Sequence, residues 1–424
     1  MHKMGNLIFD GKGIIGHDLI VKMKKSIEML LQGFPPITVN GTAKEPITAL
    51  TVYGHSKQDG TPSPENPVPI VSAGDSGEIE AKVYGGNLIS SDISSWNHTG
   101  WNGTVLQLSD GIKIKAIKGW EKAYYDTSEM NGKTLNLSFN YRQIESETTS
   151  PSTSNAFAIV VQNENAYPTT ADDFPFQINS PETVKTHVSV SFTARNYLCF
   201  FLRVNTEGLE AGETRAIEVT NIMLNAGNTE LIYEPYKTPQ SIVLSTPNGL
   251  PGIPVSSGGN YTDENGQQRI CNEIDLARGK YVQRIGHNAN VNDWVRKPGN
   301  PDIESTTSRF ALDIENIDNY IYSPCICNRL SYAKVDSYGT EGTYVTINET
   351  SSKCIFARIE GITSLEDFRA AMPDLEVIWL LETPIETDLP AEEIAAYKAL
   401  HTYSPTTTVS NDAAAWMKVG VIME

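Results

Sequence analysis

The sequence predicts a mainly β, multi-domain protein built around an antiparallel β-sandwich or jelly roll, with a short N-terminal helix and a small α+β C-terminal region. Apolar and polar residues alternate through most of residues 87–237, as they do in strands with one buried face and one solvent-exposed face. Turn signals such as Asn131-Gly132 separate these runs. Many short strands at this spacing favour a sandwich or jelly roll.

Four runs within 87–237 show the alternation most clearly. Each has an apolar side chain at every second position and polar side chains between them. The predicted inward residues are Leu135, Leu137, Phe139, Tyr141, Val188, Val190, Phe192, Ile112, Ile114, Ile217 and Val219. Because they form a closed apolar set, we expect residues 87–237 to fold as one domain.

Composition restricts the function. The chain has 424 residues, enough for several domains, and a formal net charge of −18. This acidity argues against nucleic acid as a partner, because phosphate contacts need clustered Lys and Arg. The most apolar runs are too short to span a bilayer, so no membrane insertion is expected. Residues 1–13 lack a signal-peptide pattern, which predicts synthesis in a cytoplasm without signal-directed export.

Residues 1–36 are predicted to form a helical anchor. Between 17 and 34, apolar residues recur at alternating steps of three and four, namely Ile20, Met23, Ile27, Leu30 and Phe34. A helix this short is marginal alone, so it would dock on its own chain or associate with copies of itself. In the second case Ile20, Met23, Ile27 and Leu30 would be the oligomerisation residues.

Residues 37–86 and 238–286 are predicted to form one discontinuous, β-rich connector domain, with 87–237 inserted between its halves. Domains inserted in this way keep their termini close together at the surface. The first half contains GHSKQDGTPSPENPVPIVSAGD, with prolines at 62, 64, 67 and 69. Proline fixes φ and removes a donor, so this segment should be extended with few internal hydrogen bonds.

Residues 287–424 are predicted to form a C-terminal β-rich domain with two short helices. Thr363 is a candidate N-cap for a helix from Ser364 to Met372, in a capping-box pattern. A second helix should begin near Pro390. The closing strand is expected at 413–422.

Several stretches carry a family resemblance. Within 87–237 these are the opening GNLI, the central GKTLNLSFNYR and the closing IEVTNIMLNAGNTELIYEPY, which look like a carbohydrate-binding-module-type jelly roll. The proline-rich segment, STPNGLPGIPVSSGGNYTDENGQQRICNEIDLARGKYVQRIG at 245–286 and the C-terminal LPAEEIAAYKALHTYSPTTTVSNDAAAWMKVGVIME resemble tail and baseplate-associated proteins of phages that infect Gram-positive bacteria. Together the matches cover most of the chain in fragments.

The resemblance implies a phage virion protein of the tail or baseplate, of receptor-binding or tail-fibre type. Its implied partners are a host cell-surface glycan and other tail or baseplate proteins, and its implied state is a homotrimer. Two other functions remain open: a purely structural baseplate component whose jelly roll binds protein, and a tail-associated glycan depolymerase.

A sugar site in a jelly roll would use aromatic rings stacked on the sugar, flanked by side chains that bind its hydroxyls. The candidate residues are Trp96, Trp101, Trp120, Tyr124, Tyr125, Gln162, Asn163 and Arg203. These tryptophans would alternatively fill the sandwich core. We expect at least one of the three to be exposed and to face a ligand.

Catalytic and metal-binding patterns give little support for other chemistry. No nucleophile-elbow, zinc-protease or P-loop motif is present, so no enzymatic activity is predicted. The Cys325-Ile326-Cys327 pair has no second pair to complete a zinc site, and no cofactor is expected. The acidic loop Asp126–Glu129 is the one candidate for a structural calcium ion.

Overall fold

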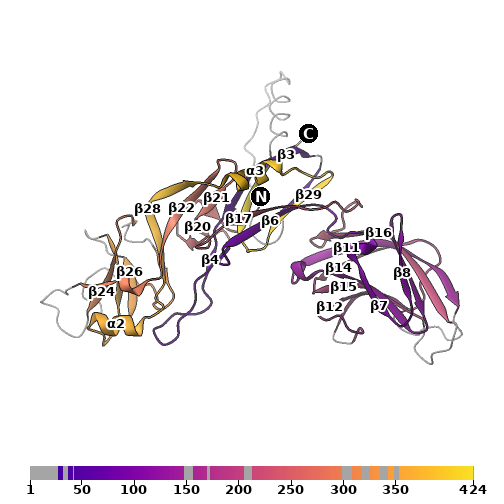
Figure 1. The fold of residues 1–424 in the computed structure, drawn as a ribbon, viewed down its shortest axis with the longest axis horizontal. Coiled ribbons are helices and arrows are strands. Elements are labelled where there is room, and N and C mark those ends of the chain that lie inside the picture. The colour runs from indigo at the N-terminus through magenta and orange to yellow at the C-terminus, as the bar shows by residue number, and fades with distance from the viewer. Residues whose placement is uncertain are drawn as a thin grey trace, which may run out of the picture.

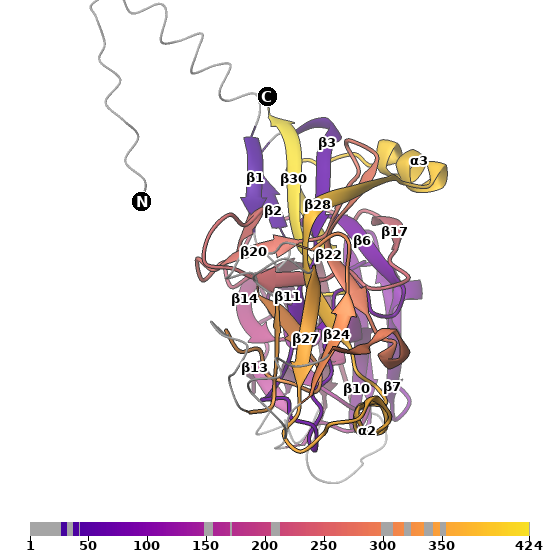
Figure 2. The same cartoon turned by 90° about the vertical axis from the view of Figure 1, so that its left-hand side faces the viewer.

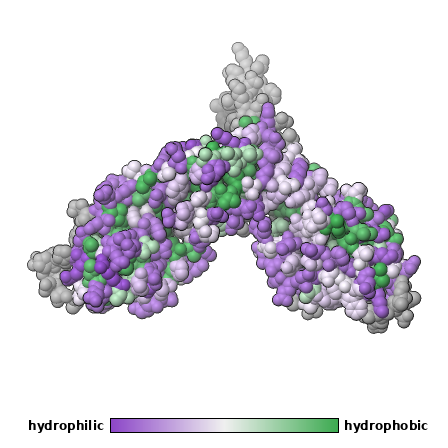
Figure 3. Space-filling view, viewed as in Figure 1, coloured by the Kyte–Doolittle hydropathy of each residue, from purple (hydrophilic) through white to green (hydrophobic). Residues whose placement is uncertain are grey.

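The computed structural model describes most of the chain and confirms a mainly β, multi-domain, antiparallel architecture. The described residues are 27–31, 37–41, 43–147, 156–169, 172–204, 213–297, 308–317, 324–334, 342–347 and 353–423. They form an arch, with a central connector and one β body at each end (Figure 1). Turned by 90°, the two outer bodies overlap below the connector (Figure 2). The space-filling view shows open space between them (Figure 3).

One outer body, here called the sandwich domain, contains residues 87–237 and two five-stranded sheets. The first sheet has the order β13 (Asp173–Ile178), β12 (Phe157–Gln162), β15 (Tyr197–Arg203), β10 (Trp120–Asp126), β7 (Asn97–Gly100). The second has the order β14 (Thr186–Thr193), β11 (Thr134–Glu147), β16 (Thr214–Ala226), β9 (Gly111–Ile117), β8 (Thr104–Leu108). Every strand pair in both sheets is antiparallel.

The core of the sandwich domain follows from the alternation in the sequence. Side chains at every second position of a strand point to the same side of the sheet. The inward residues of β11, such as Leu137 and Phe139, are fully buried and meet Phe157 and Phe200 from the facing sheet. Burial of apolar area in such a continuous core is the main stabilising contribution.

The chain enters and leaves the sandwich domain at one place. The buried side chain of Asn87 donates hydrogen bonds to the carbonyls of Ile222 (2.9 Å) and Glu234 (3.1 Å), and accepts them from Ile89 and Leu224. A Cβ on Gly86 would lie 1.9 Å from a carboxylate oxygen of Glu234 and 2.9 Å from Thr406 Cβ, so a larger residue would displace these side chains. The two ends of the domain are therefore joined directly.

The connector is a second sandwich. Its larger sheet runs on into the other outer body, in the order β1 (Ile27–Leu31), β30 (Trp416–Met423), β3 (Ala43–Tyr53), β21 (Glu273–Asp275), β22 (Lys280–Asn288), β28 (Val377–Asp388), β25 (Cys325–Cys327). Its smaller sheet has the order β17 (Gln240–Ser245), β6 (Glu78–Gly85), β29 (Thr406–Asn411), β2 (Ile37–Asn40). The two halves of the connector meet where β17 pairs with β6 and β21 pairs with β3.

Short elements complete the connector. A three-stranded sheet contains β18 (Gly252–Pro254), β20 (Gln268–Cys271) and β19 (Tyr261–Thr262), and β4 (Ser56–Lys57) pairs with β5 (Val71–Ser72). Helix α3 (Ala391–Ala399) contributes Tyr397 to the connector core. None of the helices in the described part of the chain is both long enough and apolar enough to cross a membrane.

The predicted boundary of the C-terminal domain at 287–424 is corrected by these pairings. Strand β29 lies between β6 and β2, and β30 lies between β3 and β1. The last part of the chain therefore belongs to the connector, because its apolar residues pack on the connector core. Such long-range pairing has no local signal in the sequence.

The other outer body, here called the C-terminal body, is built from residues between 291 and 379. Its own sheet has the order β23 (Val295–Lys297), β24 (Arg309–Asp313), β27 (Cys354–Arg358), β26 (Tyr344–Ile347). Helix α2 (Leu365–Ala371) begins after Ser364, whose side chain accepts the Asp367 amide, so Ser364 and not Thr363 is the N-cap. Cys325 and Cys327 are buried in this core.

The proline-rich segment forms a strap from the connector to the C-terminal body. Gln58 Nε2 donates to the carbonyls of Val68 and Cys327, both at 2.8 Å, and the Val68 amide donates to the Asn328 carbonyl at 2.7 Å. Arg329 donates to the Pro64 carbonyl. Hydrogen bonds in both directions therefore join the strap to the C-terminal body.

The predicted N-terminal helix is corrected where the structure describes it. Residues 27–31 form strand β1, which pairs antiparallel with β30, so Ile27 and Leu30 are not on a helical seam. Pairing to a sheet edge gives this apolar segment hydrogen-bond partners that a short helix would lack. Ile20 and Met23 lie outside the described residues.

Candidate functional site

The candidate site lies on the first sheet of the sandwich domain, on the side that faces away from the sandwich core. Because side chains alternate, Leu198, Phe200 and Leu202 of β15 enter the core, while the residues between them project outward. We call this side the outer face. It is formed by Trp120, Lys122, Tyr124, Ala158, Val160, Gln162, Tyr197, Cys199, Phe201 and Arg203.

The sheet register brings several predicted site residues together on the outer face. Trp120 pairs directly with Arg203, and Tyr197 pairs with Gln162 on the next strand. Directly paired residues project from the same side of a sheet. Tyr124 lies on the same side of β10, four residues from Trp120. Asn163, just after β12, is exposed, and its carbonyl accepts from the Asn196 side chain.

Trp96 and Tyr125 do not belong to the outer face, which corrects the predicted site. Trp96 is only 6% exposed, and its ring centroid lies 5.3 Å from Tyr125 and 5.5 Å from Phe200, inside the core. Its Nε1 donates to the Ser90 carbonyl at 2.6 Å, which satisfies the buried indole. A ring enclosed in this way has no open surface for a sugar.

Trp101 is the most exposed of the three candidate tryptophans, at 47%. It lies in the connection between β7 and β8, and its amide donates to the Trp120 carbonyl at 3.2 Å. Its ring rests against the backbone at Gly119, directly before Trp120. Trp101 therefore sits beside the end of the outer face at which Trp120 and Arg203 lie.

A loop covers the centre of the outer face. This covering loop, residues 163–169, places the ring of Tyr167 5.3 Å from Trp120 and 5.8 Å from Phe201. The Ala166 carbonyl accepts from Lys122 Nζ at 2.5 Å and from Gln162 Nε2 at 3.3 Å. Phe201 and Lys122 are consequently buried, while Tyr167 stays 42% exposed.

The charged groups of strand β10 are shifted by burial. Burial lowers the pKa of Lys122, because removal from water disfavours the charged ammonium. Burial raises the pKa of Glu121 for the corresponding reason, and a contact of 3.3 Å between its carboxylate and His98 Nδ1 opposes the rise. Lys122 is thus a buried amine at the centre of an aromatic surface.

The residues of this face that the sequence reasoning missed include Tyr197, Tyr167 and Lys122. Tyr197 lies 5.7 Å from Tyr124, with the two rings perpendicular. Tyr167 belongs to the covering loop and packs on Trp120, and Lys122 lies beneath this loop. The alternation along β10 and β15 could have found Tyr197 and Lys122, but nothing local could place a loop residue on the sheet.

The arrangement leaves two aromatic groups at the ends of the face. Trp101, Trp120 and Tyr167 lie at one end, and Tyr124 and Tyr197 at the other. Partly exposed aromatic rings offer flat apolar surface, and Arg203 adds hydrogen-bond donors beside Trp120. Such a surface can stack on ring-shaped ligands.

The predicted calcium loop is engaged in other contacts. Asp126 accepts from the Ser128 amide at 2.9 Å, and Glu129 forms an ion pair with Lys82 of the connector at 2.9 Å. Within the described residues, no group of three His, Cys, Asp or Glu side chains is placed to hold a metal ion.

No model of a known protein family matches this chain, and no curated protein matches it. Among solved structures, similar chains include a family 29 carbohydrate-binding module, CBM29_1, from Piromyces equi, with 11% identity and a TM-score of 0.21, covering 42% of this chain and 90% of that one. The CBM22-1–GH10 modules of xylanase Xyn10B from Clostridium thermocellum, complexed with xylohexaose, show 9% identity and a TM-score of 0.23, covering 36% of this chain and 30% of that one. The CBM22-1–CBM22-2 tandem of Paenibacillus barcinonensis Xyn10C shows 9% identity and a TM-score of 0.23, covering 79% and 98%. With TM-scores this low, the assignment of the fold rests on the strands and their pairing.

Proposed function

We propose that the sandwich domain binds a glycan through its outer face. The observation that supports this most directly is the gathering of Trp120, Tyr124, Tyr197 and Tyr167 on one side of one sheet. Aromatic rings supply large rigid contact area at a small entropy cost, and the ring faces of sugars are apolar. In this proposal the sugar hydroxyls are bound by Arg203, which pairs with Trp120, and by Asn163, which is exposed just after β12.

The test is a glycan array probed with the full chain, followed by titration calorimetry with the strongest ligand. Removal of a stacking ring should cost ~2 kcal/mol, so Trp120→Ala and Tyr124→Ala should each weaken binding by about 30-fold. Leu106→Ala is the matched control, because Leu106 is 52% exposed and lies on the other sheet. Unchanged affinity in both ring variants would reject the outer face as the site.

The biological setting proposed for this binding is adsorption of a phage tail to a bacterial surface, as a virion protein of the tail or baseplate. It is supported by the resemblance of the proline-rich segment, of residues 245–286 and of the C-terminus to such proteins. A purely structural baseplate role and a glycan depolymerase are the alternatives. Mass spectrometry of purified virions would test the setting, and release of reducing ends from the bound glycan would reveal the depolymerase.

A homotrimer is proposed on the same resemblance. Light scattering on the full chain should give a mass close to three times that of one chain, which is 46.6 kDa. Ile20→Asp tests the predicted seam at a position separate from strand β1. A monomeric wild-type chain would remove the trimer proposal and would leave the glycan proposal untouched.

A further inference from the structure

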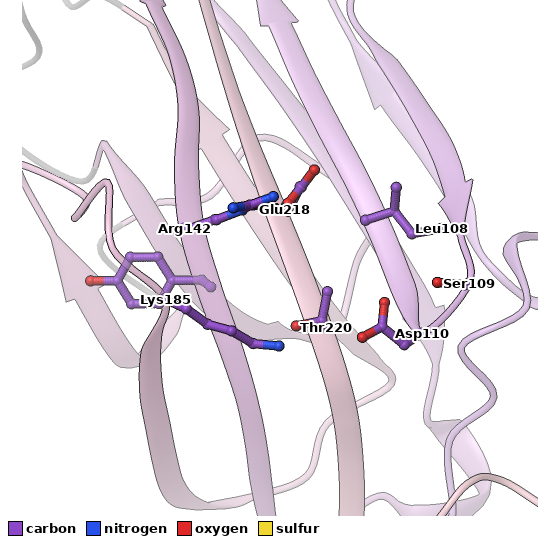
Figure 4. Close-up of a pocket in the computed structure, with 8 residues that line it drawn as sticks. Leu108, Ser109, Asp110, Arg142, Lys185, Glu218 and Thr220 are labelled. Atoms are coloured by element: carbon purple, nitrogen blue, oxygen red, sulfur yellow. Dashed lines mark hydrogen bonds and ion pairs between the residues drawn. The ribbon is translucent and has the colours of Figure 1, made fainter.

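A polar pocket lies on the second sheet of the sandwich domain, opposite the outer face (Figure 4). It has a volume of about 380 Å³. Its walls come from the β8–β9 turn with Ser109 and Asp110, from Arg142 of β11, from Glu218 and Thr220 of β16, and from Lys185 just before β14. This volume falls at the lower end of the range usual for small-molecule sites.

The backbone fixes the Asp110 wall of the pocket. The Asn221 amide donates to the Asp110 carbonyl at 2.9 Å, and Asn221 has a φ of 52°, which turns the chain at this point of β16. A Cβ on Gly111 would lie 2.0 Å from the Val219 carbonyl oxygen, so only glycine lets the turn approach β16 this closely. The backbone of Asp110 is therefore held against β16 at the edge of the pocket.

The charges in the pocket are balanced. Arg142 Nε lies 2.6 Å from Glu218 Oε2, so these two groups neutralise each other within the wall. Asp110 and Lys185 are the remaining charges, and neither forms a salt bridge with another of the described residues. Figure 4 shows both side chains directed toward Thr220. The pocket thus offers a carboxylate acceptor and an ammonium donor without a net charge.

A tyrosine outside the pocket lining is influenced by the charge of Asp110. Tyr233, in the segment by which the chain leaves the sandwich domain, is 39% exposed. Burial raises the pKa of the Tyr233 phenol, and the negative charge of the Asp110 carboxylate raises it further. Ile232 beside it is 87% exposed.

We propose that this pocket is a second ligand site of the sandwich domain and that it takes a neutral, hydroxyl-rich sugar residue. Neighbouring hydroxyls can donate to the two oxygens of Asp110 while a hydroxyl or ring oxygen accepts from Lys185. A charged sugar would leave one of these two groups opposed by a like charge. The site is on a different sheet from the proposed glycan face, so it does not depend on that face.

The experiment uses the full chain and four methyl glycosides, those of glucose, galactose, mannose and N-acetylglucosamine, with affinity measured by saturation-transfer NMR. At least one should bind saturably, and Asp110→Asn and Lys185→Met should each weaken it about tenfold. The amide of Asp110→Asn keeps the side-chain shape. The control is Asp59→Asn, which changes an exposed carboxylate of the strap and should leave binding unchanged.

Trp120→Ala separates this site from the outer face. Binding that survives Trp120→Ala and is weakened by Asp110→Asn supports the second site. Loss of all glycoside binding in Trp120→Ala overturns it and leaves the outer face as the sole sugar site. The proposal is also overturned if no glycoside binds to the wild-type chain, or if glycine, a zwitterion, binds to the pocket and the glycosides do not. Melting temperatures of both pocket variants, close to that of the wild type, would establish that folding is intact.

Discussion

Replacement of Trp96 by alanine should destabilise the sandwich domain without touching the outer face. Trp96 is 6% exposed, packs on Tyr125 and Phe200, and donates to the Ser90 carbonyl. Truncation of such a residue costs ~3–5 kcal/mol, because it leaves a cavity in a close-packed core. For a domain of this size each kcal/mol lowers the melting temperature by ~2–4 °C, so a shift of ~6–20 °C is expected.

Scanning calorimetry on the full chain measures this shift, and hydrogen exchange locates it. Protection should fall in β11 and remain unchanged in β6 of the connector. Trp101→Ala is the matched control, because a largely exposed side chain contributes only about 0.5 kcal/mol. Equal shifts in the two variants would refute the reasoning. So would a Trp96→Ala variant that melts like the wild type and has lost glycan binding.

Three further variants test other parts of the structure. Lys122→Met should stabilise the chain by about 1 kcal/mol at pH 7. Because the pKa of Lys122 is lowered on folding, this gain in stability should shrink as the pH rises toward about 10.4. Thermal melts in which the gain grows with pH would contradict a lowered pKa for Lys122. Glu121→Gln should also be more stable than wild type at pH 7. Because the pKa of Glu121 is raised on folding, the difference in stability should vanish as the pH falls below about 4.3. A difference in melting temperature that persists at pH 3 would contradict a raised pKa for Glu121. Gln58→Ala removes two hydrogen bonds of the strap and should speed amide exchange at Val68 at least about fivefold, whereas Lys57→Ala should not.

Much of the sandwich domain could be predicted because its signals are local. The alternating runs at 134–141, 188–192, 112–114 and 217–219 became β11, β14, β9 and β16, and all four belong to one sheet. The same alternation distinguishes inward from outward residues on each strand. It could therefore assign Trp120 and Tyr124 to one side of β10, and they do share that side.

Other features depend on contacts between distant residues and had no local signal. Trp96 lies just before β7, so no strand period indicated which way its ring would turn. The covering loop meets the sheet through Tyr167 and Ala166, which lie more than forty residues from Trp120 and Lys122. The spacing at 27–31 fits a helix and also fits an apolar edge strand, and only the presence of β30 decides between them.

The double attachment of the sandwich domain has a mechanical consequence. The sandwich domain is covalently connected to the end of β6 and the start of β17. These two strands are hydrogen-bonded neighbours in the connector, with Val83 opposite Gln240. A tensile load on the domain would enter both strands at the same end and would be divided between two covalent tethers. The load would act on β6 and β29 in shear, so that the hydrogen bonds between these two strands would bear it together. A peeling load would instead break the same hydrogen bonds one after another. Asn87 ties the two tethers at their base, so neither would lengthen before the other.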